Sequence, residues 1–150
     1  MTIEYTELAA SGMHVSDSIY DQLGFKRTDP SCTRMLAAHR GQELVGIGRL
    51  IDLGEEAGEH SFELGGMWVD GSARRHGIAG QIVEQLIAWA PEGTALWCTP
   101  FADLMKLYGA HGFVEVERAS APAALERRLE FCTGVQTQPV IVTRLSFDSQ

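Results

Sequence analysis

The sequence predicts an α/β domain in which a mixed, mostly antiparallel sheet of about six to seven strands carries helices on both faces. Several strand-like runs follow one another before residue 70, and an amphipathic helix comes directly after the last of them. A chain of 150 residues with 45% hydrophobic content has the size of one ordinary domain. Residues 1–150 are therefore expected to form a single domain.

The first half of the chain alternates apolar and polar residues in a way that favours strands. Ile3–Leu8 is predicted as a strand, and Val15–Gln22 as a short helix with a serine or aspartate cap that ends at Gly24. Phe25–Pro30 is expected to be a loop. Three strands of an antiparallel meander are expected next, with a polar turn region at Asp52–His60: Thr33–Ala38, Leu44–Ile51 and Phe62–Val69.

The second half begins with a helix whose apolar residues recur at about 3.6 residues, from near Gly77 to Ala90 before Pro91. The elements expected after it are a buried strand, a helix and two further strands: Ala95–Thr99, Ala102–Gly109, Phe113–Glu117 and Val140–Phe147. The connection Ala119–Pro139 is longer than a hairpin needs and holds a helical stretch, Ala123–Glu130. We expect this connection to be a lid over the substrate side.

Composition excludes several classes of function. A net charge of −8 disfavours binding to nucleic acid or to an anionic membrane surface. The chain has no apolar run of about 18 residues and no basic, signal-like start, so a soluble cytoplasmic protein is expected. Three cysteines without Cys-x-x-Cys spacing imply neither a disulfide framework nor a metal site. Cys98 stands in an apolar run and is interpreted as a packing residue.

A glycine-rich segment with cationic residues precedes the long helix: Val69-Asp-Gly-Ser-Ala-Arg74-Arg75-His76-Gly77-Ile78-Ala79-Gly80. The N-terminus of a helix offers unpaired N–H groups and a partial positive charge to a phosphate, and glycine allows close approach. Neither a P-loop nor a Gly-x-Gly-x-x-Gly fingerprint is present. An anion cradle is therefore predicted; the alternative is a tightly packed helix start with solvated arginines.

Two adjacent glycines, Gly65 and Gly66, stand inside the strand that leads to this cradle. Glycine inside a strand marks a bulge or a close backbone approach. A bulge would expose backbone donors and would reverse the side of the sheet on which the following residues lie. A strand merely weakened by two glycines is the alternative.

The segment Arg74-Arg75-His76-Gly77-Ile78-Ala79 resembles the Arg/Gln-x-x-Gly-x-Gly/Ala signature of the GNAT superfamily of acyl-CoA N-acyltransferases. Downstream, Leu107-Tyr108-Gly109-Ala110-His111-Gly112-Phe113 is similar to the Leu-Tyr-x-x-x-Gly-Phe segment of that family. Gly71 stands where the family often has proline, and Phe101 where many members have asparagine. The resemblance implies a GNAT-like fold with a V-shaped splay between the fourth and fifth strands.

The resemblance also implies acetyl-CoA as cosubstrate, with no metal. The pantetheine arm of the cofactor would pair with the backbone of Met67, Trp68 and Val69, beside the bulge. The residues that would hold its phosphates are those of the cradle: Arg74, Arg75, His76, Gly77, Ile78, Ala79 and Gly80.

Two side chains are the candidate catalytic residues. Tyr108 stands where family members place the general acid, and an aromatic core residue is the alternative. Glu63 has the offset at which several members keep a general base, the alternatives being a solvated carboxylate, Asp70, His60 or water. His111 is expected to be a solvated histidine.

The function implied is direct transfer of an acetyl group from acetyl-CoA to a primary amine of a small molecule or peptide, through a ternary complex. The rival interpretations are an acyl-CoA-binding or sensing module without catalysis, an unrelated nucleotide-binding α/β domain, and a hydroxyl acceptor. A homodimer is common for such folds, and no residue pattern decides it here.

Overall fold

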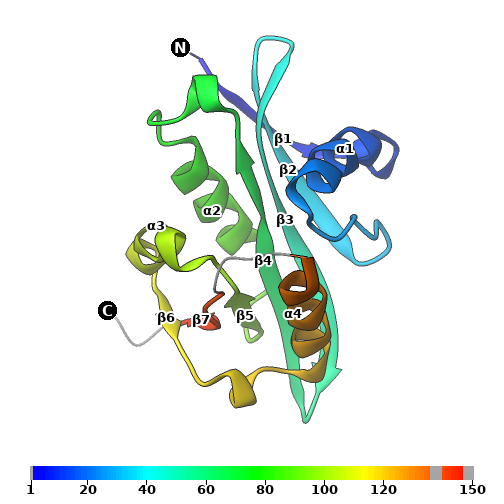
Figure 1. Ribbon diagram of the computed structural model, residues 1–150, viewed down its shortest axis with the longest axis vertical. Coiled ribbons are helices and arrows are strands. Elements are labelled where there is room, and N and C mark those ends of the chain that lie inside the picture. Colours follow the sequence, from blue (N-terminus) through cyan, green and yellow to red (C-terminus); the bar gives the residue numbers. More distant parts are fainter. Residues whose placement is uncertain (1, 136–139, 147–150) are drawn as a thin grey trace.

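One sheet forms the centre of the molecule (Figure 1). The computed structural model describes residues 2–135 and 140–146, and in this part of the chain seven strands lie in the order β1-β2-β3-β4-β5-β7-β6. The strands are β1 (Glu4–Leu8), β2 (Thr33–Arg40), β3 (Glu43–Glu56), β4 (Glu59–Val69), β5 (Ala95–Cys98), β6 (Phe113–Glu115) and β7 (Thr143–Leu145). β4 and β5 pair in parallel, and the other neighbours are antiparallel. The predicted mixed, mostly antiparallel sheet is confirmed.

The hairpin of β3 and β4 is longer than predicted. Both strands continue through the polar segment that was expected to be a turn region, Asp52–His60, until Glu56 pairs with Glu59. Ala57 and Gly58 close the hairpin with φ values of 53° and 81°. A two-residue turn with positive φ fits the twist of the strands, so polar residues that face solvent need not end them. The prediction of a broad turn region is wrong.

β4 and β5 share only a short parallel register, from Ser61 with Ala95 to Leu64 with Cys98. β5 ends there, and beyond Leu64 no strand among the described residues pairs with this edge of β4. The two strands therefore diverge, which confirms the expected splay between the fourth and fifth strands. From Gly65 onward this edge of β4 presents its backbone groups to the gap.

The glycine pair forms the predicted bulge. The register of β4 on β3 shifts between the pairs Trp68–Ile47 and Gly65–Arg49, which leaves an extra residue in β4. Gly66 has φ +61°, and its carbonyl accepts a hydrogen bond of 2.7 Å from the Tyr20 hydroxyl. Because the bulge reverses the alternation of side chains, residues before it and after it exchange faces of the sheet.

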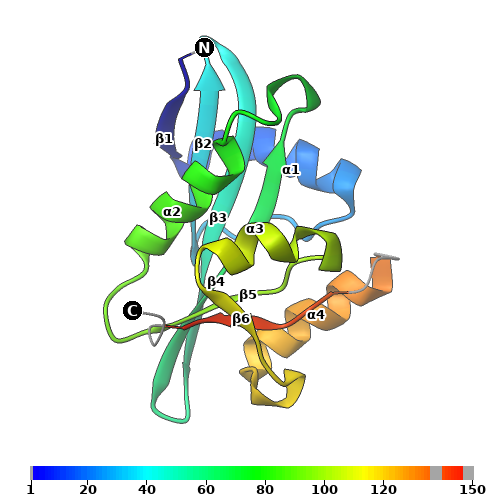
Figure 2. The ribbon, with the colours of Figure 1, turned by 90° about the vertical axis from the view of Figure 1, so that its left-hand side faces the viewer.

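Helices cover both faces of the sheet, as predicted (Figures 1 and 2). They are α1 (Met13–Leu23), α2 (Ile78–Trp89), α3 (Met105–Ala110) and α4 (Ala123–Val135). α2 packs its buried residues on one face, together with α3: Ile78, Ile82, Val83 and Leu86. α1 and α4 lie on the opposite face, where Leu125 and Leu129 of α4 pack beside Trp97. No helix among the described residues is long and apolar enough to span a bilayer.

α1 differs from the prediction at its start. It begins at Met13, directly after a 3-10 turn at Ala10–Gly12, and its first turn has no side-chain cap. The expected serine or aspartate cap is therefore wrong, because the preceding turn continues into the helix. Gly24 ends the helix in the left-handed conformation, with φ 74°, as predicted.

The elements after β5 are shorter than predicted. The expected helix Ala102–Gly109 divides into a 3-10 turn at Ala102–Leu104 and α3. β6 and β7 have three residues each, and β7 pairs with both β5 and β6. Phe147, expected to end the last strand, lies outside the described residues.

Candidate active site

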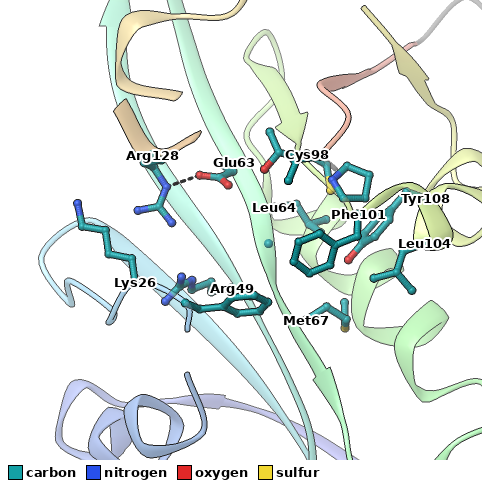
Figure 3. A pocket seen from close by; sticks show the side chains of 16 residues that line it. Lys26, Arg49, Glu63, Leu64, Met67, Cys98, Phe101, Leu104, Tyr108 and Arg128 are labelled. Atoms are coloured by element: carbon teal, nitrogen blue, oxygen red, sulfur yellow. Dashed lines mark hydrogen bonds and ion pairs between the residues drawn. The ribbon is translucent and has the colours of Figure 1, made fainter. Parts of the chain in front are cut away.

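A hollow that opens to solvent lies where β4 and β5 diverge (Figure 3). The residues labelled in the figure come from the loop after α1, from β3, β4 and β5, from the segment after β5, and from α3 and α4: Lys26, Arg49, Glu63, Leu64, Met67, Cys98, Phe101, Leu104, Tyr108 and Arg128. The two candidate catalytic residues, Glu63 and Tyr108, thus line the same space.

Glu63 and Tyr108 reach the hollow from opposite faces of the sheet. Glu63 is in register with Trp97, whose side chain packs under α4. Tyr108 belongs to α3 and packs with Leu64 on the α2 face. A group bound in the gap between β4 and β5 would therefore have the carboxylate on one side and the phenol on the other.

Glu63 is held by an arginine that sequence analysis missed. Its side chain is buried, with the residue 6% exposed, and Arg128 Nε of α4 donates a hydrogen bond to Oε1. The other oxygen, Oε2, lies 3.5 Å from the position that a Cβ on Gly65 would occupy. One carboxylate oxygen is thus anchored, while the other borders the free edge of β4. Arg128 lies in the connection that the sequence predicts as a lid.

Tyr108 has a packed ring and a hydroxyl that points into the hollow (Figure 3). The residue is 3% exposed, and its ring meets Phe113 edge-on with 6.1 Å between centroids. Burial raises the pKa of the phenol well above 10, so the group keeps its proton at neutral pH. Its ring contributes to the core, while its hydroxyl is available for chemistry.

Cys98 also lines the hollow, but as a protonated thiol. It is 2% exposed, and desolvation, with the nearby charge of Glu63, raises its pKa well above 9. A thiol must ionise to act as a nucleophile, so its burial favours the packing role that the apolar run predicts.

The buried thiol and phenols give the stability of the fold a pH dependence. Burial raises the pKa of Cys98, Tyr20 and Tyr108, whereas in an unfolded chain such groups titrate at about 8.5 and 10. Above those values the unfolded chain has lost protons that the folded chain keeps. The contribution to stability is therefore complete below pH ~8.5. At higher pH we expect the free energy of unfolding to fall by about 1.4 kcal/mol per pH unit for each group.

Urea denaturation between pH 7 and 11 measures this decline. Replacing Cys98 by alanine should remove the part that begins near pH ~8.5, because only the tyrosines then remain to titrate. Cys32→Ala is the matched control, since Cys32 is only half-buried and lies outside the hollow. An unchanged pH dependence for Cys98→Ala would contradict the assignment.

The predicted anion cradle has the expected backbone geometry. The first hydrogen bond of α2 runs from the Gln81 N–H to the Gly77 carbonyl, over 3.0 Å, so the N–H groups of residues 78–80 precede it. Gly77 has φ 74°, and Arg75, although it is not glycine, has φ 68°. Such left-handed residues turn successive N–H groups toward a common point, which is suited to an anion. The side chains of residues 74–76 are exposed at this end of the helix.

The residues around the cradle take different roles. Arg74 Nε donates to the Val69 carbonyl at 3.3 Å and so braces the loop. Asp70 accepts hydrogen bonds from the Ser72 hydroxyl and, at 3.1 Å, from the Ser72 N–H. These two bonds lower the pKa of its carboxyl. His111 is partly exposed, and its Nε2 lies 3.6 Å from the position that a Cβ on Gly80 would occupy. The short turn after α3 folds it back toward α2.

The two alternative bases do not line the hollow. Asp70 is engaged in the loop, and His60 pairs with Asp52 at 2.6 Å while its ring stacks on Phe62. Of the carboxylates and histidines described, Glu63 is the one that borders the space. No group of three or more histidine, cysteine or acidic side chains that could hold a metal occurs among the residues that the structure describes.

Arg49 and Lys26 are further lining residues that sequence analysis missed. A signal for Arg49 was present, because it is a lone arginine within the apolar run Val45-Gly-Ile-Gly-Arg49-Leu-Ile. A charged residue at the centre of a buried strand requires a partner or a ligand. Lys26 stands in a polar loop and carries no comparable signal.

Comparison with known proteins identifies the family. Residues 4–113 match the family model described as "Acetyltransferase (GNAT) family", which spans most of the chain. The chain belongs to the GNAT acetyltransferase family, and it is an acetyltransferase that uses acetyl-CoA. A search of curated proteins gave no match.

Solved structures share the fold at low sequence identity. Arabidopsis thaliana NAA60 in complex with acetyl-CoA has a TM-score of 0.70 and 12% identity, with 99% of this chain and 100% of that chain covered. Arabidopsis thaliana Naa50 in complex with the bisubstrate analogue CoA-Ac-MVNAL has a TM-score of 0.71 and 12% identity, with 98% and 100% covered. A GNAT-family acetyltransferase from Staphylococcus aureus MU50 has a TM-score of 0.67 and 16% identity, with 97% and 100% covered.

Proposed function

We propose that this chain transfers the acetyl group of acetyl-CoA directly to a primary amine of a small molecule or peptide, within a ternary complex. The observation that carries the proposal is the hollow at the divergence of β4 and β5, which Glu63 and Tyr108 both line beside a free strand edge. Acetyl transfer to an amine needs a proton acceptor on one side of the carbonyl and a proton donor on the other.

The backbone provides places for the two ends of the cosubstrate. The edge of β4 beyond Leu64 has no strand partner among the described residues, so the backbone of Met67, Trp68 and Val69 can pair with the pantetheine arm, apart from the Val69 carbonyl, which accepts from Arg74. The N–H groups at the start of α2 and the cationic residues before it fit the diphosphate. Both features lie after the bulge at Gly66, along one continuous stretch of chain.

The side chains then divide the proton transfers between them. Glu63 Oε2 takes a proton from the acceptor ammonium, directly or through a water, and the free amine attacks the carbonyl carbon of the thioester. As the carbon–sulfur bond breaks, Tyr108 gives its proton to the departing sulfur. The attacking nitrogen loses its second proton as the amide forms, and this proton returns through water to the Tyr108 phenolate, while the proton on Glu63 passes to solvent. Arg128 keeps the Glu63 carboxylate in place through Oε1. The products are the acetylated amine and free CoA.

Direct transfer is favoured over an acetylated cysteine. The cysteine that lines the hollow, Cys98, lies in the short strand β5, and burial raises the pKa of its thiol. The hollow therefore supplies no ready thiolate to take the acetyl group first.

An amine acceptor also agrees with one of the similar structures. The bisubstrate analogue bound to Arabidopsis thaliana Naa50, CoA-Ac-MVNAL, joins CoA to a peptide through an acetyl group. The hollow in the present chain is open to solvent, so it admits either a small amine or the end of a peptide.

Ligand-dependent melting and an acetylation assay test the proposal together. A ligand at about 100 times its Kd stabilises a protein by about 2.7 kcal/mol, which for this size raises the Tm by about 5–10 °C. We expect CoA and acetyl-CoA to produce this shift and ATP to produce none. Release of CoA thiol should then require an added amine, and matched alcohols should give no release.

Arginine variants connect the melting shift to the cradle. Replacing Arg74 and Arg75 by alanine should weaken CoA binding roughly tenfold or more, from the loss of charged hydrogen bonds. Arg127→Ala, an exposed arginine of α4 away from the hollow, should bind CoA as the wild type does. Binding of CoA without acetylation of any amine would instead indicate an acyl-CoA-binding module.

A further inference from the structure

The hollow carries an excess of positive charge that acetyl transfer does not use. Lys26, Arg49 and Arg128 line it, against the single carboxylate of Glu63. Arg128 is paired with Glu63, so those two charges cancel. Lys26 and Arg49 remain, in a chain whose net charge is −8. A local cationic site in an acidic protein points to an anionic ligand.

Arg49 is buried without the partners that a guanidinium needs. It is 3% exposed, and its Nε has no hydrogen-bond partner. One of its nitrogens, Nη1, donates to Thr28 Oγ1 at 2.9 Å, and the group lies over the Tyr20 ring at 4.2 Å. Among the described residues no ion pair joins it to a carboxylate. A buried donor without an acceptor is costly, so a ligand that supplies one binds with a gain.

The unpaired nitrogen lies next to the proposed site of attack. Arg49 Nε is 2.8 Å from the position that a Cβ on Gly66 would occupy, and Glu63 Oε2 is 3.5 Å from the corresponding position on Gly65. These two glycines are consecutive, and neither has a side chain between the groups and the strand edge. A single small molecule can therefore reach both the carboxylate and the guanidinium.

We propose that the acceptor is an amine that also bears a carboxylate, with the amine beside Glu63 and the carboxylate bound by Arg49. This inference rests on the proposed function, because it specifies the second substrate of the same site. The planar fork of arginine suits a carboxylate, and Lys26 at the exposed side of the hollow adds a second positive charge. A doubly charged phosphate would be repelled more strongly by Glu63, so the carboxylate is the favoured anion.

Matched pairs of amines, with and without a carboxylate, test this acceptor preference in the wild-type protein. The probes are glycine, β-alanine and γ-aminobutyrate, each with its carboxamide, and two C-terminally amidated peptides that begin with Glu-Ala or Gln-Ala. O-Phosphoethanolamine with ethanolamine forms the phosphate pair. We expect at least one carboxylate to exceed its carboxamide in kcat/KM by roughly 10- to 100-fold, the strength of a charged hydrogen bond. The distance between amine and carboxylate in the substrate that is acetylated distinguishes a free amino acid from an acidic peptide.

Variants of Arg49 assign the preference to this side chain. Arg49→Met should reduce the ratio between carboxylate and carboxamide to near one, while Arg49→Lys should keep part of it. A Tm shift with CoA shows that each variant is folded with its cosubstrate site intact. Arg34→Met is the matched control, because Arg34 is an exposed arginine of β2 that pairs with Glu7 outside the hollow.

The outcomes separate this inference from the proposed function. Equal turnover of carboxylates and carboxamides, or a preference for the phosphate, overturns the inference while acetyl transfer stands. If no amine is acetylated, the proposed function fails, and calorimetric titration of the CoA-bound protein with the same pairs decides the anion site. If the wild-type protein binds a carboxylate and the Arg49→Met variant does not, the anion site is supported. If the carboxamide binds as tightly as the carboxylate, the anion site is overturned.

Discussion

Replacing Tyr108 by phenylalanine is expected to lower kcat by about 10²- to 10⁴-fold, the usual contribution of a general acid. The substitution removes one oxygen and leaves the ring in place against Phe113, so the fold should be preserved. Because the phenol is proposed to act on the departing sulfur, the loss belongs to the chemical step. The Kd for acetyl-CoA, measured by calorimetry, should stay unchanged.

Tyr5→Phe is the matched control for this prediction. It removes the same atom from a partly buried tyrosine of β1, which does not line the hollow. Its kcat should equal that of the wild type. If Tyr108→Phe also keeps full turnover, the phenol has no part in the reaction and the ring is a core residue only.

Replacing Gly66 by alanine is expected to destabilise the fold by about 2–5 kcal/mol. Its φ of +61° disfavours any residue with a Cβ, which costs roughly 1–2 kcal/mol. The added Cβ would also stand 2.5 Å from the Tyr20 hydroxyl oxygen and 2.8 Å from Arg49 Nε, so both groups must move, at roughly 1–3 kcal/mol. Urea denaturation of the variant and the wild type measures the total loss in the free energy of unfolding.

Gly65→Ala provides the matched comparison at the adjacent position. There the nearest atom to the new Cβ is Glu63 Oε2 at 3.5 Å, an ordinary contact, and φ is not in the left-handed region. We expect a change within about 1 kcal/mol. Similar stabilities for the two variants would mean that Gly66 is not held in the bulge.

The parts of the fold with strong local signals could be predicted from the sequence. The apolar period of α2 and its start at Gly77 are local properties, and so is the glycine pair that produces the bulge. The long hairpin could not be predicted, because polar residues at its end look like a loop until the turn at residues 57–58 is known. Its length depends on pairing between strands rather than on either strand alone.

In the candidate site, too, some residues could be predicted from the sequence and others could not. Glu63 and Tyr108 were found through motif positions, and they line one hollow. The pairing of Glu63 with Arg128 joins residues 65 positions apart, and it exists only because α4 packs beneath β5. For Arg49 the sequence context is unusual and could be noticed, but only the fold reveals that its Nε has no hydrogen-bond acceptor.

The short register between β4 and β5 has a consequence for the order of folding. β1 to β4 each pair with the next strand along the chain, so these contacts are local and close quickly. The parallel contact is made only after α2 has crossed over, and it joins the two parts of the sheet through four residue pairs. Glu63 and Arg49 belong to the first part, and Tyr108 to the second. Catalytic competence thus requires both parts of the sheet, and we expect a chain that holds the meander alone to be inactive.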